Sequence, residues 1–269
     1  MNAWGTAQLA LLAAALFGAA SAAVVALGYP RLRVRLARLP SHRRAAWLVA
    51  LAVLPFVAAA VLTALCFAPK LVAGLVPTGD HCLSHGGVAH PHFCPEHLAL
   101  HSGSPAAWIL LAALAAWTTG RFVPVLVRTV RAWRAGRRLA RGASFDPARA
   151  AWILPGDLPV AAAIGLWRPR TMISRGLLRA VPPELTEAIL EHERAHARRR
   201  DTLRVLTTTI LSLAHLPRTR RLLLDDLSLA VEQACDEESG ARLGDRLRVA
   251  RALLAAARLL QRPEPGVVV

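Results

Sequence analysis

The chain of 269 residues is 55% hydrophobic and carries a formal net charge of +16. It is too apolar and too basic to be an ordinary soluble globular domain, and its mean hydropathy of +0.40 indicates a membrane protein. Basic proteins also bind nucleic acid, but much of the positive charge here stands beside apolar runs, where it orients the chain and meets anionic lipid. We therefore expect membrane lipid as a partner and no direct contact with nucleic acid.

Three apolar runs are long enough to cross a bilayer, which takes about 20 mostly uncharged residues. They cover 7–27, 45–67 and 106–127. Six arginines crowd the connection between the first two runs, whereas the loop 68–105 holds Lys70 as its only fixed positive charge, and more arginines follow the third run. Because positive side chains stay on the cytoplasmic side, the N-terminus and this loop are predicted outside. The chain is thus expected to be a multi-pass protein of the cytoplasmic (plasma) membrane, with a membrane domain at 1–127 and a cytoplasmic domain at 128–269.

The 68–105 loop combines two cysteines with most of the histidines of the chain. Cys82 and Cys94 lie together on the predicted outer side, where the compartment permits a disulfide. The histidines fit either a metal- or pH-responsive sensor or a solvated loop tied by that disulfide. Their irregular spacing favours the second interpretation.

The predicted cytoplasmic domain begins with an arginine-rich helix to about residue 140, which 142–147 breaks. Over 151–178, prolines and glycines separate short apolar runs, a pattern typical of short β-strands. A helix with prolines at its start follows over about 183–200. The next apolar run, 203–216, is too short for a span. It fits a buried core helix or a dip into the membrane face, and we prefer the buried core helix.

Two histidines four residues apart, His192 and His196, enclose Glu193 in the pattern H-E-x-x-H. On a helix both imidazoles project from one face and can reach one cation. Zinc bound there with an open position activates water while an adjacent carboxylate takes the proton, which makes Glu193 the candidate base. The pattern arises by chance with a probability on the order of one per cent, so it calls for a third ligand.

The third ligand is expected on a helix downstream of the motif. Glu232 and Asp236 lie four residues apart and so share one helical face. We predict Glu232 as the metal ligand and Asp236 as the partner of a ligand imidazole. Taken alone, Glu232 fits a solvated acidic helix better, and only its combination with the two histidines reverses that preference. Asp201 fits equally an orienting partner for a ligand and an ion-pair partner for nearby arginines.

Three stretches of the chain follow one another in order: GLWRPRTMISRGLL, ELTEAILEHERAHARRRD and VEQACDEESG. Together they resemble the BlaR/MecR family of integral-membrane zinc metallopeptidases, the antirepressor sensors of β-lactam resistance and their relatives. The family pattern G-x-x-x-P-x-I-x-x-S matches at Gly165, Pro169 and Ser174. Thr171 stands where the isoleucine would be. The pattern H-E-x-x-H-x-x-x-x-D ends at Asp201, and a glutamate followed by Ala-Cys-Asp is present in the third stretch.

The resemblance implies that His192, His196 and Glu232 bind one Zn²⁺ ion and that Glu193 acts as base and acid. It also implies a bacterial signal-transduction role, in which the enzyme cleaves a cytoplasmic protein such as a transcriptional repressor. The expected fold is a mostly α membrane protein with three N-terminal transmembrane helices. Its cytoplasmic part is expected to be an α+β zincin-like metallopeptidase domain of the gluzincin type with a small β-sheet against the histidine helix.

One departure and two alternatives accompany this interpretation. Sensor members of the family carry a further span and a large extracytoplasmic domain after the peptidase, and the printed chain lacks both, so penicillin sensing is not expected. An HtpX-like or CAAX-type protease shares the histidine and glutamate motifs but acts on membrane proteins or prenylated tails. A metal-stabilised signalling scaffold without catalysis is the third option, and substitution of Glu193 separates it from an enzyme.

Overall fold

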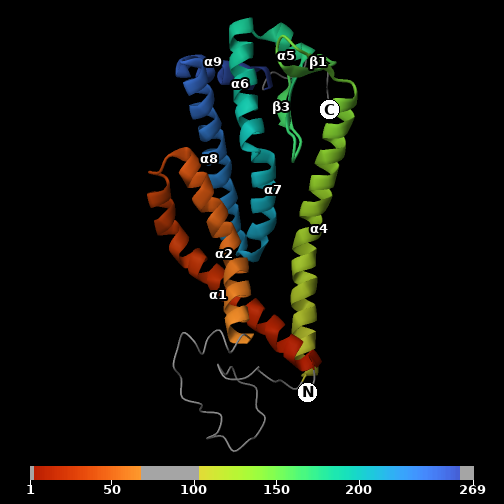
Figure 1. Cartoon of the computed structure of the whole chain (residues 1–269), viewed down its shortest axis with the longest axis vertical. Coiled ribbons are helices and arrows are strands. Elements are labelled where there is room, and N and C mark those ends of the chain that lie inside the picture. Colours follow the sequence, from red (N-terminus) through yellow and green to blue (C-terminus); the bar gives the residue numbers. More distant parts are fainter. Residues whose placement is uncertain (1–2, 68–102, 261–269) are drawn as a thin grey trace, which may run out of the picture. The chain divides into compact units, whose positions relative to one another are not determined.

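The computed structural model describes residues 3–67 and 103–260 (Figure 1). The described chain is mostly helical and contains one small mixed sheet, which confirms the expected fold class. Cys82, Cys94 and the histidine-rich part of the predicted outer loop lie outside the described residues. The disulfide and the sensor interpretation of that loop therefore stay predictions.

Three long helices in the first half of the chain are apolar enough to cross a membrane. They are α1 (Ala3–Leu36), α2 (Ser41–Phe67) and α4 (Pro105–Arg141). Each contains one of the three predicted apolar runs, and α4 continues into the arginine-rich stretch without a break. Three candidate spans are thereby confirmed, because runs of alanine, leucine and valine satisfy their backbone hydrogen bonds internally and tolerate lipid around them. The orientation of the spans stays a prediction.

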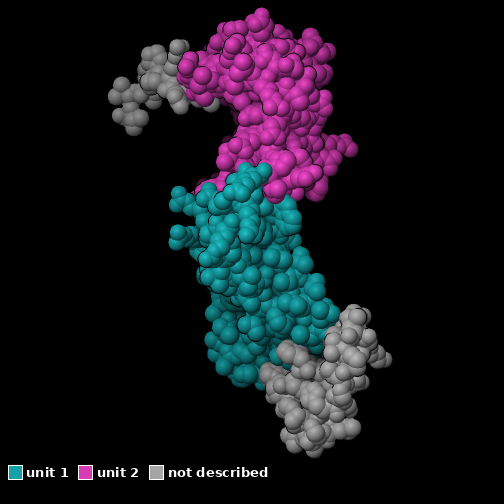
Figure 2. All heavy atoms as spheres, turned by 90° about the vertical axis from the view of Figure 1, so that its left-hand side faces the viewer, with its two compact units in different colours: residues 1–38, 47–124, 210–223 teal, residues 39–46, 125–209, 224–269 magenta. Residues whose placement is uncertain are grey.

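The described chain falls into two compact units, coloured separately in Figure 2. Unit 1 comprises residues 1–38, 47–124 and 210–223. Within it, the imidazole Nε2 of His215 lies 3.1 Å from the carbonyl oxygen of Leu51, and Arg121 donates to the carbonyl of His215 over 3.1 Å. The end of the apolar run 203–216 therefore packs among the long apolar helices rather than in the core of unit 2.

Unit 2 comprises residues 39–46, 125–209 and 224–269 and contains the sheet. The strands are β1 (Ser144–Asp146), β2 (Ala151–Leu154), β3 (Ala161–Ile164) and β4 (Arg170–Ser174). Their order is β1-β2-β4-β3, with β2 and β4 parallel and the outer pairs antiparallel. β3 is therefore an edge strand. The division of the chain at residue 127 into two domains stays a prediction.

The residues of the G-x-x-x-P-x-I-x-x-S pattern build the turn and the end of this sheet. Gly165 has a φ of +129°, which glycine adopts without a steric penalty, and it opens the turn between β3 and β4. Ser174 ends β4 and caps α5 (Arg175–Ala180), since its hydroxyl accepts hydrogen bonds from the backbone N–H groups of Leu177 and Val160. These residues shape the backbone rather than perform chemistry.

The remaining helices carry the histidine motif and the glutamate. They are α6 (Pro183–Arg199), α7 (Asp201–Leu211), the short 3₁₀ helix η2 (Ser212–Ala214), α8 (Pro217–Leu243) and α9 (Arg246–Leu260). α6 packs against β3, β4 and α9. Buried Ile173, Ile189 and Val249 belong to the core that joins these elements. α6 ends where Arg200 takes a left-handed conformation with φ 53°, and this reversal lets α7 start at Asp201.

Candidate metal centre

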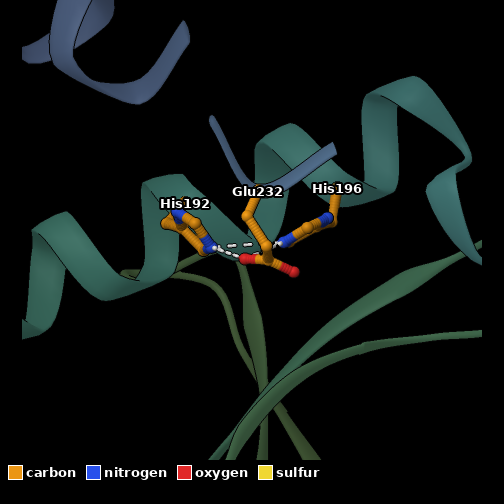
Figure 3. A group of neighbouring side chains, drawn as sticks. All are labelled: His192, His196 and Glu232. Atoms are coloured by element: carbon orange, nitrogen blue, oxygen red, sulfur yellow. Dashed lines mark hydrogen bonds and ion pairs between the residues drawn. The ribbon is translucent and has the colours of Figure 1, made fainter. Parts of the chain in front are cut away.

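Two histidines of α6 and one glutamate of α8 meet in unit 2 (Figure 3). The Nε2 atoms of His192 and His196 lie 3.1 Å apart, and Oε2 of Glu232 lies 3.5 Å and 3.6 Å from them. Tetrahedral zinc, with ligands at about 2.0–2.1 Å, sets its donor atoms about 3.4 Å apart. The triangle of two nitrogens and one carboxylate oxygen thus has the size and the chemistry of three corners of a tetrahedral zinc site with the fourth corner free.

The electrostatics of the cluster agree with a place for a cation. Burial opposes the charged form of His192, but Asp236 and Glu232 outweigh burial and raise the pKa of this imidazole to about 9. Burial also opposes the charged form of His196, but its contacts with Asp201, Cys235 and Glu232 outweigh burial and raise the pKa of this imidazole to about 12. Hydrogen bonds from both rings lower the pKa of Glu232 to about 2. The same carboxylates that favour the charged imidazoles would favour a divalent ion at this place.

Each ligand-type imidazole has a carboxylate at its other nitrogen. Nδ1 of His196 lies 3.1 Å from Oδ2 of buried Asp201. Nδ1 of His192 lies 3.0 Å from Oδ1 of Asp236, as an ion-pair contact rather than an aligned hydrogen bond. Such carboxylates fix the ring orientation and the tautomer of metal-binding histidines. The structure therefore places Asp236 beside a histidine, as the sequence predicted, and places Asp201 in the position that one of its two interpretations gave it.

A buried thiol, which the sequence interpretation did not assign to the site, joins this arrangement. Sγ of Cys235 donates to Oδ2 of Asp201 over 3.2 Å and lies 3.2 Å from Nδ1 of His196. The sequence spacing could have indicated Cys235, because it stands three residues after Glu232 on one helix and so lies close to it on the helix surface. Burial raises the pKa of the thiol, so it remains a donor.

The group of His196, Asp201 and Cys235 is compact enough to resemble a second metal site. Its charge argues against that use. Arg204 donates to Oδ1 of Asp201 over 2.9 Å, and Arg199 lies 3.4 Å from Oδ2, so two guanidinium groups already neutralise the carboxylate. A further cation there would be repelled. We interpret this group as the support of His196.

Glu193 lies between α6 and the edge strand of the sheet. Its carboxylate accepts a hydrogen bond from the backbone N–H of Ala163 in β3, and burial raises its pKa. A carboxylate with a raised pKa next to candidate metal ligands suits both removal and return of a proton near neutral pH. The position of Glu193 thus agrees with an acid–base group.

Comparison with known proteins supports the metal-centre interpretation at the level of a family. Residues 130–262 match the sequence profile of peptidase family M48. This match covers every residue of the cluster and supports a metallopeptidase domain of that family in a chain with candidate membrane helices. It does not support the BlaR/MecR type in particular. Neither a curated protein nor a solved structure gives a match.

Proposed function

We propose that the protein is a membrane-anchored, zinc-dependent endopeptidase that cleaves a cytoplasmic protein. The observation that carries this proposal is the triangle of His192, His196 and Glu232 with Glu193 beside it. M48 peptidases are metal-dependent. Zinc is the metal we propose, because two imidazoles and one carboxylate around an open position are typical of its catalytic sites.

In the proposed reaction Glu193 carries out the proton transfers. The chemistry that bound zinc supplies is activation of water, whose pKa falls toward about 7. Glu193 takes the proton of the attacking water and returns it to the nitrogen of the leaving peptide. Its burial and its hydrogen bond to the N–H of Ala163 hold the carboxylate in place for both steps.

The edge strand β3 supplies a place for an extended peptide. In the antiparallel ladder the backbone groups of Ala162 point toward Met172 of β4, so those of Ala161 and Ala163 point toward the free edge. The N–H of Ala163 donates to Glu193, and the backbone groups of Ala161 and the carbonyl of Ala163 are left for a peptide. A peptide that adds to this edge as a further strand passes beside Glu193. The small alanine side chains leave room for substrate side chains. A protein segment in extended form is therefore the proposed substrate.

The proposed setting is the cytoplasmic face of a bacterial membrane. Basic residues crowd the α1–α2 connection and the C-terminal half of α4, a distribution that retains both on the cytoplasmic side. A peptidase that is tethered there meets cytoplasmic proteins. By the resemblance of its motifs to BlaR/MecR proteins, a transcriptional repressor in a signalling pathway is the substrate we propose to test first.

The substitution Glu193→Gln tests the enzymatic part of the proposal. The amide keeps the shape of the side chain but cannot accept a proton, so the variant should bind about one zinc ion per chain and lose peptide hydrolysis by a factor of at least about 100. Metal content and cleavage of a candidate repressor are measured on the full chain in detergent. Unchanged hydrolysis by the variant would reject Glu193 as the base, and a cellular phenotype that persists in the variant would favour the signalling scaffold.

A further inference from the structure

Two tryptophans of unit 2 are more exposed than is usual for such large apolar side chains. Trp167, in the turn between β3 and β4, is 71% exposed, and Trp133, on α4, is 51% exposed. Their elements lie against each other, because a Cβ atom at Gly136 would come within 3.1 Å of the side chain of Ile164, the last residue of β3. The turn follows directly after Ile164, so the two tryptophans belong to one end of unit 2.

Positive charge surrounds Trp133. A shallow recess of about 320 Å³ is lined by this residue and four arginines. The arginines are Arg134, Arg137, Arg138 and Arg141. The guanidinium of Arg137 lies 4.9 Å from the centre of the Trp133 ring, and none of the four forms an ion pair with a carboxylate among residues 3–67 and 103–260. Arg168, next to Trp167, is exposed as well. The surface thus offers aromatic rings and unneutralised cations together.

The position of this surface along α4 points to the membrane–water boundary. The apolar part of the helix ends at Val127, and Trp133 follows six residues later, about 9 Å further along the axis at about 1.5 Å per residue. The headgroup layer extends about 5–8 Å beyond the hydrocarbon core. Helical side chains tilt toward the helix N-terminus, so Trp133 and Arg134 lean back toward this layer.

The β3–β4 hairpin reaches the same level. In Figure 1 the hairpin runs beside the C-terminal part of α4, and its turn points toward the lower-numbered residues of that helix. The contact of Gly136 with Ile164, the residue before the turn, joins the two elements. Trp167 at the turn is therefore displaced from Gly136 toward the end of the apolar stretch. Tryptophan is enriched at membrane–water interfaces because its ring is apolar while its N–H is polar.

We propose that Trp167, Trp133 and the arginines of the recess form a docking surface for the headgroups of anionic phospholipids. The inference rests on the membrane anchoring that is part of the proposed function. Arginine binds lipid phosphate by charge-assisted hydrogen bonds, while the two rings enter the interface. Docking holds the β3–β4 hairpin, and with it the edge strand beside Glu193, at the bilayer surface. Peptide segments close to the membrane are then the ones that reach the site.

The test uses the full chain reconstituted in nanodiscs whose lipids carry bromine near the headgroup end of their acyl chains. The variant Trp167→Phe isolates the emission of Trp167 by difference from the unsubstituted protein. Trp152→Phe is the matched control, because Trp152 lies in β2 with its ring against Phe145 and Arg170. We expect brominated lipid to quench most of the Trp167 difference emission and to leave the Trp152 difference emission almost unchanged.

A second arm identifies the headgroup chemistry. Replacement of Arg134, Arg137 and Arg138 by glutamine should reduce the quenching of Trp167 in discs that contain phosphatidylglycerol, with little effect in phosphatidylcholine alone. The proposal is overturned if brominated lipid leaves the Trp167 emission unquenched while aqueous acrylamide quenches it freely, or if the arginine substitutions change nothing in anionic discs. Neither arm depends on hydrolysis, so a failure of the proposed catalysis leaves this result readable.

Discussion

Helix α6 carries two polar clusters that differ in what neutralises their carboxylates. In the first, His192 and His196 face Glu232 of α8. In the second, the carboxylate of buried Glu191 accepts hydrogen bonds from Arg198 over 2.8 Å and from Arg194 over 3.1 Å. Arg198 also joins α8, where its Nε donates to Glu238 over 2.7 Å. Both clusters thus link α6 to an acidic residue of α8 through nitrogen donors.

The difference shows why only one of them is a candidate metal site. Guanidinium groups remain protonated at any physiological pH and have no lone pair to offer a metal ion. Imidazole can lose its proton and then become a ligand. The Glu191 cluster is therefore neutralised without a ligand, whereas the imidazoles of the histidine cluster have lone pairs that can bind a cation. Spacing in the sequence alone does not distinguish the histidine cluster from the Glu191 cluster, because both lie on a charged helix.

Removing a proposed ligand should have the largest effect on metal binding, and it would remove the property that distinguishes the histidine cluster from the Glu191 cluster. In His192→Ala or Glu232→Ala, two donors remain, and we expect the approximately one zinc ion per chain to be lost together with hydrolysis. Metal content is measured on the detergent-purified protein after the loop histidines have been replaced, so that the loop does not contribute. Full metal retention in Glu232→Ala would mean that the third ligand is another residue.

A smaller effect is expected where only the orientation of a ligand is lost. Asp236 lies 3.0 Å from Nδ1 of His192 but outside the triangle of donor atoms. The variant Asp236→Asn should weaken zinc binding by about 10–100-fold, because such partners fix the ring orientation and the basicity of the ligand. Competition with a chromophoric chelator measures the affinity. If the affinity of the variant equals that of the unsubstituted protein, the contact has no role in holding the metal.

Cys235 should sharpen the comparison further, since it acts through Asp201 rather than on the metal. The variant Cys235→Ala removes one hydrogen bond to this carboxylate, and a net loss of about 0.5–1 kcal/mol corresponds to about two- to fivefold weaker zinc binding. Cys235→Ser keeps a donor and should restore most of the affinity. Cobalt-substituted protein offers a second measurement, because its visible spectrum reports the geometry around His196. A serine variant as weak as the alanine variant would assign the effect to packing.

Much of the site could be predicted because it depends on local spacing. His192 and His196 share a helical face by periodicity alone, and Glu232 was found as the carboxylate of the next acidic helix. The three spans followed from the length of apolar runs. The arrangement of the sheet could not be predicted, since the parallel pairing of β2 with β4 and the edge position of β3 depend on contacts between residues distant in sequence. The contact between Ala163 and Glu193 could not be predicted for the same reason, because it depends on the edge position of β3.

Other features escaped because sequence gives no measure of burial. Asp201 fitted orientation of a ligand and pairing with arginine equally well, and the structure shows both, with His196 on one oxygen and Arg204 on the other. Cys235 was noted only as part of a family pattern, because a thiol in an acidic helix has no distinctive spacing. For the run 203–216 we preferred a buried core helix, whereas its end packs with the apolar helices of unit 1 through His215.

The smallest effect on metal binding is expected at the second cluster, with Glu191→Gln. Glutamine keeps the shape of the buried side chain but removes the charge that Arg198 and Arg194 share, so zinc content and affinity should stay unchanged. The free energy of unfolding should fall by about 1.5–3 kcal/mol, the range for hydrogen bonds to a charged group. Chelator competition and denaturant unfolding of metal-loaded protein measure the two quantities side by side. A large loss of zinc affinity in this variant would show that the clusters are coupled through α6, and that the guanidinium network helps to hold the histidines in position.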